Sequence, residues 1–263
     1  MTQSPPEFLD HDGVRLAYRR SSASPAHADA RHASVVWLGG FHSDMLGEKA
    51  TLLHEAVAAS GRAHIRFDYL GHGESGGAFA EGTIGRWRSD ALAVIDNLTR
   101  GPLVLVGSSM GGWMSLLCAL ARPERVKALV LLAPAPDFTD KLMWASFDDS
   151  QKRQIMEQGH WTRPSPYDPA GYPITKMLIE EGRDWNILDA EIPLDIPVRI
   201  LHGGLDADVP WTHSLDLADK LRTRDVVWTL IKDGDHRLSR PQDITRMIAT
   251  VLATAEQVEV ASL

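Results

Sequence analysis

The chain passes from one hydrophobic pattern to another within residues 103–121, which read LVLVGSSMGGWMSLLCALA. Residues 103–106 are all apolar, as is typical of a strand buried on both faces of a parallel sheet. Residues 113–121 are mostly apolar over the length of a short buried helix. Between them lies Gly107-Ser108-Ser109-Met110-Gly111, a Gly-x-Ser-x-Gly sequence. The stretch therefore predicts a strand, a tight turn with an exposed serine, and a helix.

The same alternation of strand and helix patterns extends over most of the chain. A β-hairpin is expected around the Asp12–Gly13 turn, between residues 8–9 and 14–18. Further strands are expected at 34–38, 63–68, 128–132, 198–201 and 226–231, and helices at about 48–60, 84–98, 110–121, 212–221 and 242–256. This order predicts one α/β domain over residues 1–263, with a mostly parallel, doubly wound sheet of about eight strands. In such sheets chemistry is found at the carboxyl ends of the strands.

One interval, at about residues 136–189, interrupts the alternation. It has no strong strand pattern, several turn-forming Pro and Gly residues, and three tryptophans, Trp144, Trp161 and Trp185. An insertion of this length between two strands predicts a short helical lid. The tryptophans could line an apolar acyl pocket beneath this lid, or pack the lid against the sheet. The interval also holds ten acidic and six basic residues, so its charge of −4 is half of the chain's net charge of −8. Negative charge over the entrance would disfavour strongly anionic leaving groups.

Composition excludes several classes of protein. The 263 residues are 44% hydrophobic and 24% charged, which is ordinary for a globular chain. The net negative charge makes nucleic acid an unexpected partner. The single cysteine, Cys118, rules out an internal disulfide and any cysteine-based metal site.

The amino-terminal sequence bears on location. Residues 1–13 read MTQSPPEFLDHDG, without the basic start and apolar stretch of a secretory signal or the arginine-rich composition of a transit peptide. Apolar runs long enough to span a membrane are absent from the sequence. We therefore expect a cytoplasmic protein without a membrane span.

The turn at Ser109 suggests nucleophilic chemistry. Gly107 and Gly111 supply the lack of bulk that so tight a turn needs, and the following helix begins where developing negative charge is favoured. A plain Gly/Ser turn without chemistry is the alternative. A serine hydroxyl needs a neighbouring base, and the base needs an orienting acid. The Gly-x-Ser-x-Gly context predicts that acid and base follow the serine in that order.

Candidates for both partners follow later strands. His236 comes just after the last expected strand and is the predicted base. Two aspartates, Asp206 and Asp208, follow the strand at 198–201, and either could be the acid. Two backbone N–H groups should bind the oxyanion, those of Met110 and Phe41. Phe41 is chosen because Gly39 and Gly40, which precede it, let the backbone approach the site closely. His42 is expected to lie near the pocket.

A catalytic metal or cofactor is not expected. Histidines 42, 72, 202 and 213 lack the short spacing with a carboxylate that metallohydrolases use. The glycines of residues 68–75, DYLGHGES, are read as a structural turn.

The chain resembles the α/β-hydrolase family, over roughly residues 34–240. Within that family it is similar to a branch that includes a mitochondrial serine hydrolase, which removes S-palmitoyl groups from proteins and cleaves acyl glucuronides. The resemblance is carried by residues 65–69 (IRFDY), 83–88 (TIGRWR), 101–113, 121–126 (ARPERV), 201–211 and 235–237. It weakens in the lid and the amino-terminal hairpin, which are the regions that select substrates.

This resemblance implies a function and assigns roles. Ser109 would be the nucleophile, His236 the general base and then acid, and Asp206, by the family spacing, the orienting carboxylate. Met110 and Phe41 would form the oxyanion hole, with His42, Trp144, Trp161 and Trp185 as candidate substrate contacts. The implied reaction is hydrolysis of a small-molecule or acylated-protein ester or thioester, without a cofactor. A lactone or activated carbon–carbon bond as substrate, and a non-catalytic binding protein, remain alternatives. Acyl length, leaving group and oligomeric state are open.

Overall fold

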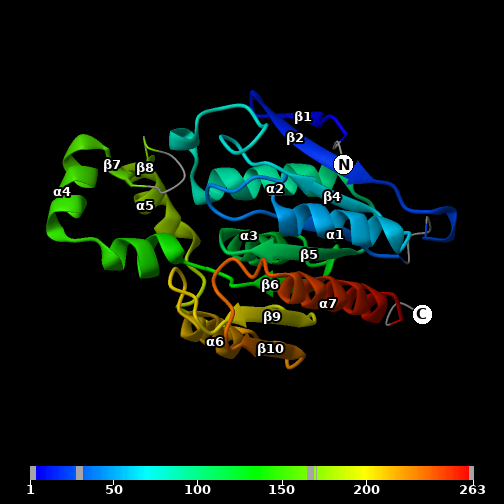
Figure 1. Ribbon diagram of the computed structural model, residues 1–263. Coiled ribbons are helices and arrows are strands. Elements are labelled where there is room, and N and C mark those ends of the chain that lie inside the picture. Colours follow the sequence, from blue (N-terminus) through cyan, green and yellow to red (C-terminus); the bar gives the residue numbers. More distant parts are fainter. Residues whose placement is uncertain (1–3, 28–31, 165–168, 170, 261–263) are drawn as a thin grey trace.

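A twisted sheet forms the centre of the molecule in the computed structural model, which describes residues 4–27, 32–164, 169 and 171–260 (Figure 1). Its order is β1-β2-β4-β3-β5-β6-β9-β10. The strands are β1 (Glu7–His11), β2 (Val14–Ser21), β3 (Ser34–Leu38), β4 (His64–Phe67), β5 (Leu103–Ser108), β6 (Val126–Leu132), β9 (Val198–Gly203) and β10 (Val226–Ile231). In this sheet β2 is antiparallel to both β1 and β4, and the other neighbouring strands pair in parallel. The predicted mostly parallel sheet is confirmed.

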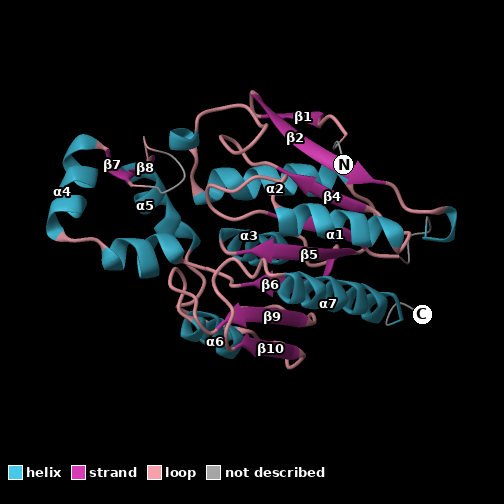
Figure 2. Cartoon of the chain, in the orientation of Figure 1, coloured by secondary structure: helices cyan, strands magenta, loops and turns pink. Residues whose placement is uncertain are grey.

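Helices cover both faces of the sheet (Figure 2). On one face α1 and α7 contact each other and the central strands. On the other face α2 and α3 pack together, and α6 covers β9 and β10. The helices of this layer structure are α1 (Glu48–Ala59), α2 (Ile84–Leu98), α3 (Met110–Ala121), α6 (Trp211–Lys220) and α7 (Pro241–Val260), with short 3-10 turns at Pro25–His27 and Phe79–Glu81.

The central strand β5 shows why the sheet is apolar on both sides. Leu103 and Leu105 belong to the core beneath α2 and α3. Val104 and Val106 belong to the second core, beneath α1 and α7. Successive side chains of a strand point to opposite faces, so a strand in the middle of a doubly wound sheet needs a continuous apolar run.

The predicted lid lies between β6 and β9, beyond the carboxyl ends of the strands, at the left of Figure 1. It contains a π-helical segment (Thr139–Trp144), α4 (Asp149–Gln158), α5 (Lys176–Gly182) and a 3-10 turn (Arg183–Trp185). Its two ends are tied together by the buried carboxylate of Asp137, which accepts the N–H groups of Ile187 (2.8 Å) and Leu188 (2.9 Å).

The lid contains a hairpin besides its helices, which the sequence did not indicate. Two short antiparallel strands, β7 (His160–Arg163) and β8 (Tyr172–Thr175), form a hairpin between α4 and α5. Each has only four residues, and β8 contains Pro173, so neither carries a strong strand pattern. A two-stranded sheet tolerates this proline because each of its strands has one unpaired edge. Residues 165–168 and 170 of the interval lie outside the described part of the chain.

Within the described ranges, no helix combines the length and the apolar character needed to cross a membrane.

Candidate active site

Ser109 occupies a strained turn between β5 and α3. Its backbone has φ 56° and ψ −118°, a region that non-glycine residues rarely adopt and that persists where the surroundings impose it. The flanking glycines make the turn possible. A Cβ on Gly107 would lie 2.2 Å from the Gly111 carbonyl oxygen, and one on Gly111 would lie 2.0 Å from the Leu38 carbonyl oxygen. The turn presents the Ser109 hydroxyl at the carboxyl end of the sheet.

The predicted oxyanion loop, residues 39–43, approaches Ser109 closely. A Cβ on Gly40 would lie 3.4 Å from the Ser109 Cβ, so only a residue without a side chain lets the loop come this close to the serine. Met110 begins α3 and is fully buried. The loop after β3 and the start of α3 thus both lie near Ser109, and the oxyanion role of the Phe41 and Met110 N–H groups stays a prediction.

His236 connects Ser109 to an acid. Its Nε2 lies 3.1 Å from the Ser109 Oγ, and its Nδ1 lies 2.7 Å from Asp206 Oδ2. Because an ionised carboxylate only accepts hydrogen bonds, Nδ1 carries the proton and Nε2 is left as the acceptor for the serine hydroxyl. The three residues come from loops after β5, β9 and β10.

Asp206 is held as a carboxylate. Its side chain is fully buried, and Oδ1 accepts the N–H groups of Asp208 (2.9 Å) and Val209 (2.8 Å). Burial raises the pKa of Asp206, but the hydrogen bonds from His202, His236 and Val209 outweigh it and hold that pKa well below its usual range. The Asp206 carboxylate therefore orients the His236 ring, with Nδ1 toward the acid and Nε2 toward Ser109.

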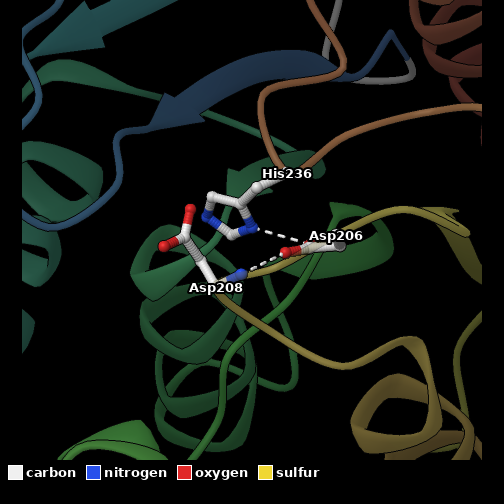
Figure 3. Close-up of side chains that lie close together, drawn as sticks. All are labelled: Asp206, Asp208 and His236. Carbon is white, nitrogen blue, oxygen red and sulfur yellow. Dashed lines mark hydrogen bonds and ion pairs between the residues drawn. The ribbon is translucent and has the colours of Figure 1, made fainter.

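The structure also separates Asp206 from the competing Asp208. Asp208 is exposed, and in Figure 3 its carboxylate lies beside the imidazole ring, away from the Asp206 contact. Asp206, Asp208 and His236 each offer an atom within 4.8 Å of the others, and together form a group with the donor types of a metal site. Within this group, Asp206 and the Nδ1 of His236 are already committed to each other by a hydrogen bond.

His42 lies where the sequence suggested, at the edge of the site. It is exposed and has φ 56°. Its ring stacks on that of Tyr172 in the lid hairpin, with centroids 4.7 Å apart. The Phe41 ring packs edge-on against Phe79 and Tyr172 among others, at 5.1 and 5.8 Å. Lid and oxyanion loop therefore form one aromatic cluster.

The three lid tryptophans pack within the lid and against its base. Trp185 donates to Glu181 (2.7 Å), and the Arg88 guanidinium lies 4.7 Å from its ring centre. The Trp144 ring has the cations of Lys152 and Arg183 at 5.5 and 5.3 Å from its centre. Trp161 packs edge-on against Phe147, 5.2 Å away. These contacts agree with the alternative in which the tryptophans pack the lid. Contact of the tryptophans with substrate stays a prediction.

Three further side chains near the site were not singled out from the sequence. His202 Nε2 lies 3.1 Å from Asp206 Oδ2. Lys49 donates to the Ser108 hydroxyl (3.0 Å), and burial lowers its pKa to about 8. His72 accepts the His42 N–H (3.1 Å). His202 and His72 follow the expected strands at 198–201 and 63–68, and that position was a usable signal. Lys49, within the helix expected at 48–60, gave none.

Comparison with known proteins identifies the family. Residues 29–160 match the family model described as serine aminopeptidase, S33. The chain is 41% identical over 246 residues to the mitochondrial palmitoyl-protein thioesterase ABHD10 of Mus musculus, covering 93% of this chain and 80% of that protein. It is 39% identical over 246 residues to the Homo sapiens protein of the same name, covering 93% and 78%.

Solved structures agree with this result. A hydrolase from Agrobacterium vitis S4 is 40% identical and superposes with a TM-score of 0.88, over 96% of this chain and all of that one. Mouse ABHD10 is 37% identical with a TM-score of 0.86, over 97% of this chain and 100% of that chain. The resemblance drawn from the sequence is confirmed, and the chain belongs to the α/β-hydrolase family of serine hydrolases, together with the ABHD10 proteins.

Proposed function

We propose that this hydrolase cleaves carboxylic esters or thioesters through an acyl-enzyme on Ser109. The observation that carries the proposal is the continuous hydrogen-bonded chain from Ser109 through His236 to the buried Asp206, at 3.1 and 2.7 Å. This is the arrangement that converts a weakly nucleophilic hydroxyl into an effective one.

The steps follow from these positions. Ser109 Oγ attacks the acyl carbonyl carbon while His236 Nε2 takes its proton. The resulting oxyanion accepts hydrogen bonds from the N–H groups of Phe41 and Met110. Collapse breaks the bond to the leaving oxygen or sulfur, which receives the proton from His236. Water then attacks the acyl-enzyme, with His236 as base, and releases the carboxylic acid and free Ser109.

An acylated-protein thioester is the substrate class that we favour. The ABHD10 relatives are named palmitoyl-protein thioesterases, and they align over 93% of this chain. The aromatic cluster of Phe41, Phe79 and Tyr172 beside the serine provides apolar surface for an acyl chain. A lactone or activated carbon–carbon bond has no specific observation in its favour.

Replacing the nucleophile tests the reaction. Ser109→Ala should reduce p-nitrophenyl octanoate turnover to a residual level, about 10³–10⁴-fold above the reaction in water. The adjacent Ser108→Ala is the matched control and should still react with a fluorophosphonate probe, whereas Ser109→Ala should not. Near-normal turnover by Ser109→Ala would end the proposal, and an unlabelled wild-type protein would favour a non-catalytic binding protein.

Acyl length and leaving group need a separate comparison. Wild-type enzyme is given p-nitrophenyl esters and matched acyl thioesters from two to sixteen carbons. We expect kcat/KM to rise with chain length and thioesters to be cleaved. Acceptance of very short acyl groups alone would overturn the thioesterase assignment while leaving the serine mechanism intact. A cytoplasmic location stays a prediction.

A further inference from the structure

We propose that His72 is a positioning residue for the oxyanion hole: its Nε2 accepts the His42 N–H and thereby directs the preceding Phe41 N–H toward the substrate oxygen. This inference rests on the proposed hydrolase function. It gives a role to the 68–75 turn beyond that of a structural connection.

Two hydrogen bonds define the state of the His72 ring. Its Nδ1 lies 3.0 Å from the Leu70 carbonyl oxygen, which can only accept, so Nδ1 carries a proton. Its Nε2 lies 3.1 Å from the backbone nitrogen of His42, which can only donate. Both contacts are satisfied by one neutral tautomer and by no other protonation state.

The surroundings of the ring favour that neutral state. His72 is 3% exposed, and Phe79 and Trp87 each contact its ring edge-on with centroids 5.2 Å away. Burial lowers the pKa of His72 to about 4, and the neighbouring His42 acts in the same direction. Near neutral pH, Nε2 is therefore a permanent acceptor in a rigid position.

An acceptor at this place matters because the oxyanion loop has two successive N–H groups that could point toward substrate. Those of Phe41 and His42 belong to adjacent peptides, and rotation of the backbone between them could exchange their directions. His42 has φ 56°, a strained conformation that something must impose. His72 binds one of the two N–H groups, so only the Phe41 N–H remains for substrate.

A second contact from the same turn fixes the far side of the loop. Asp68 accepts the Met45 N–H (2.6 Å) and, within its own turn, the Glu74 N–H (2.9 Å). The loop is thus held at Met45 as well as at His42. Of the two turn residues that hold the loop, Asp68 and His72, only His72 binds the peptide next to the proposed oxyanion donor. His72 acts through that peptide rather than by touching substrate.

Two amide substitutions separate positioning from packing. His72→Gln can place an amide oxygen near the position of Nε2, whereas the shorter His72→Asn can replace only the Nδ1 contact to Leu70. We expect kcat to fall about 100-fold in His72→Asn, as when an oxyanion donor is lost, with a smaller change in KM. His72→Gln should recover at least tenfold of that loss. Affinity for a trifluoromethyl ketone, which forms an oxyanion on serine, should fall in parallel with kcat/KM.

Controls keep the result interpretable. Rates are normalised to the folded fraction measured by circular dichroism, and His54→Asn serves as a histidine substitution elsewhere in the fold. Equal impairment of the Gln and Asn variants, near-normal kcat in both, or a loss that only follows unfolding would each overturn the role of His72. Activity retained by Ser109→Ala would instead refute the hydrolase mechanism itself.

Discussion

Gly107 and Gly111, the glycines of the turn at Ser109, leave no room for a side chain. A Cβ on Gly111 would collide with the carbonyl oxygens of Leu38 (2.0 Å) and Gly39 (2.6 Å), both backbone atoms of β3 and the oxyanion loop. We therefore expect Gly111→Ala to lower the free energy of unfolding by at least about 2 kcal/mol and to abolish most ester turnover. Gly47→Ala is the control, because its Cβ would meet nothing closer than 3.5 Å. Urea denaturation of both variants measures the difference, and equal stability would contradict the close approach.

Asp208 places a negative charge beside His236, the proposed general base. Its carboxylate is exposed, has an atom within 4.8 Å of one on His236, and raises the pKa of Tyr172, although burial is the larger cause there. Asp208→Asn should raise kcat/KM for octanoyl-coenzyme A roughly two- to tenfold at low salt, because a repulsive charge is removed. Turnover of the uncharged octanoyl-N-acetylcysteamine should be unchanged.

Salt and position provide the checks on this prediction. The gain for the coenzyme A thioester should shrink at 0.5 M salt, where exposed charges are screened. Asp149→Asn, an exposed charge in the first turn of α4, should not produce it. An equal gain for the neutral thioester would show that Asp208 acts by shape and not by charge.

Cys118 is expected to be chemically inert. It is fully buried in α3, and burial raises the pKa of its thiol to about 12, so the reactive thiolate is scarce. Folded protein should show no reaction with a disulfide reagent over the time of an assay, and one thiol per chain after denaturation. Rapid modification of the native protein would contradict the packing of α3.

At the scale of elements, the lid hairpin and the oxyanion loop depend on each other. Tyr172 of β8 stacks on His42 (4.7 Å) and contacts Phe41 (5.8 Å). Tyr172→Ala should lower kcat/KM for an octanoyl ester about two- to tenfold, the value of one aromatic contact. Tyr172→Phe retains the ring and should behave like the wild type. If the Phe variant were as impaired as the Ala variant, the hydroxyl and not the stacking would be responsible.

Elements differ in how far sequence predicts them. The β5–α3 unit was predicted because its apolar run and its glycines are local requirements of a buried strand and a tight turn. The β7–β8 hairpin was missed because four-residue strands have too few side chains to show a period. They are held by contacts from outside the hairpin, such as Tyr172 on His42.

At the scale of the whole molecule, buried histidines couple folding to pH. The Nδ1 atoms of His54 and His64 face each other at 2.8 Å, and burial lowers the pKa of both, that of His64 well below its usual value. Above about pH 6.5 neither the folded nor the unfolded chain binds a proton at His64. Below it only the unfolded chain does, so stability falls as pH falls.

This coupling predicts a measurable slope. The free energy of unfolding should decrease as pH falls from 6.5 to 5, and His64→Gln should flatten that slope by up to about 1.4 kcal/mol per pH unit. Asp68, whose pKa burial raises to about 6, acts in the opposite direction and is common to both proteins. Urea denaturation at pH 7, 6 and 5 tests this, with the exposed His160→Gln as control. Identical slopes in wild type and His64→Gln would refute it.

The sequence by itself determined the sheet and the tight turn at Ser109, and it nominated His236 as one partner of that serine. Apolar runs, glycine spacing and the order of strand ends are local features, and the position of His236 after the last strand was sufficient to nominate it. Residue reasoning alone left Asp206 and Asp208 as alternatives, because both follow the same strand. Family spacing favoured Asp206.

Only the tertiary structure decided which groups face each other. Asp206 points to His236 and takes two backbone N–H groups of its own loop, while Asp208 remains exposed. His72 lies 30 residues from His42 in sequence, yet the two are joined by a hydrogen bond. Such contacts depend on the direction of side chains from separate loops, and that direction is set when the loops pack together at the carboxyl end of the sheet.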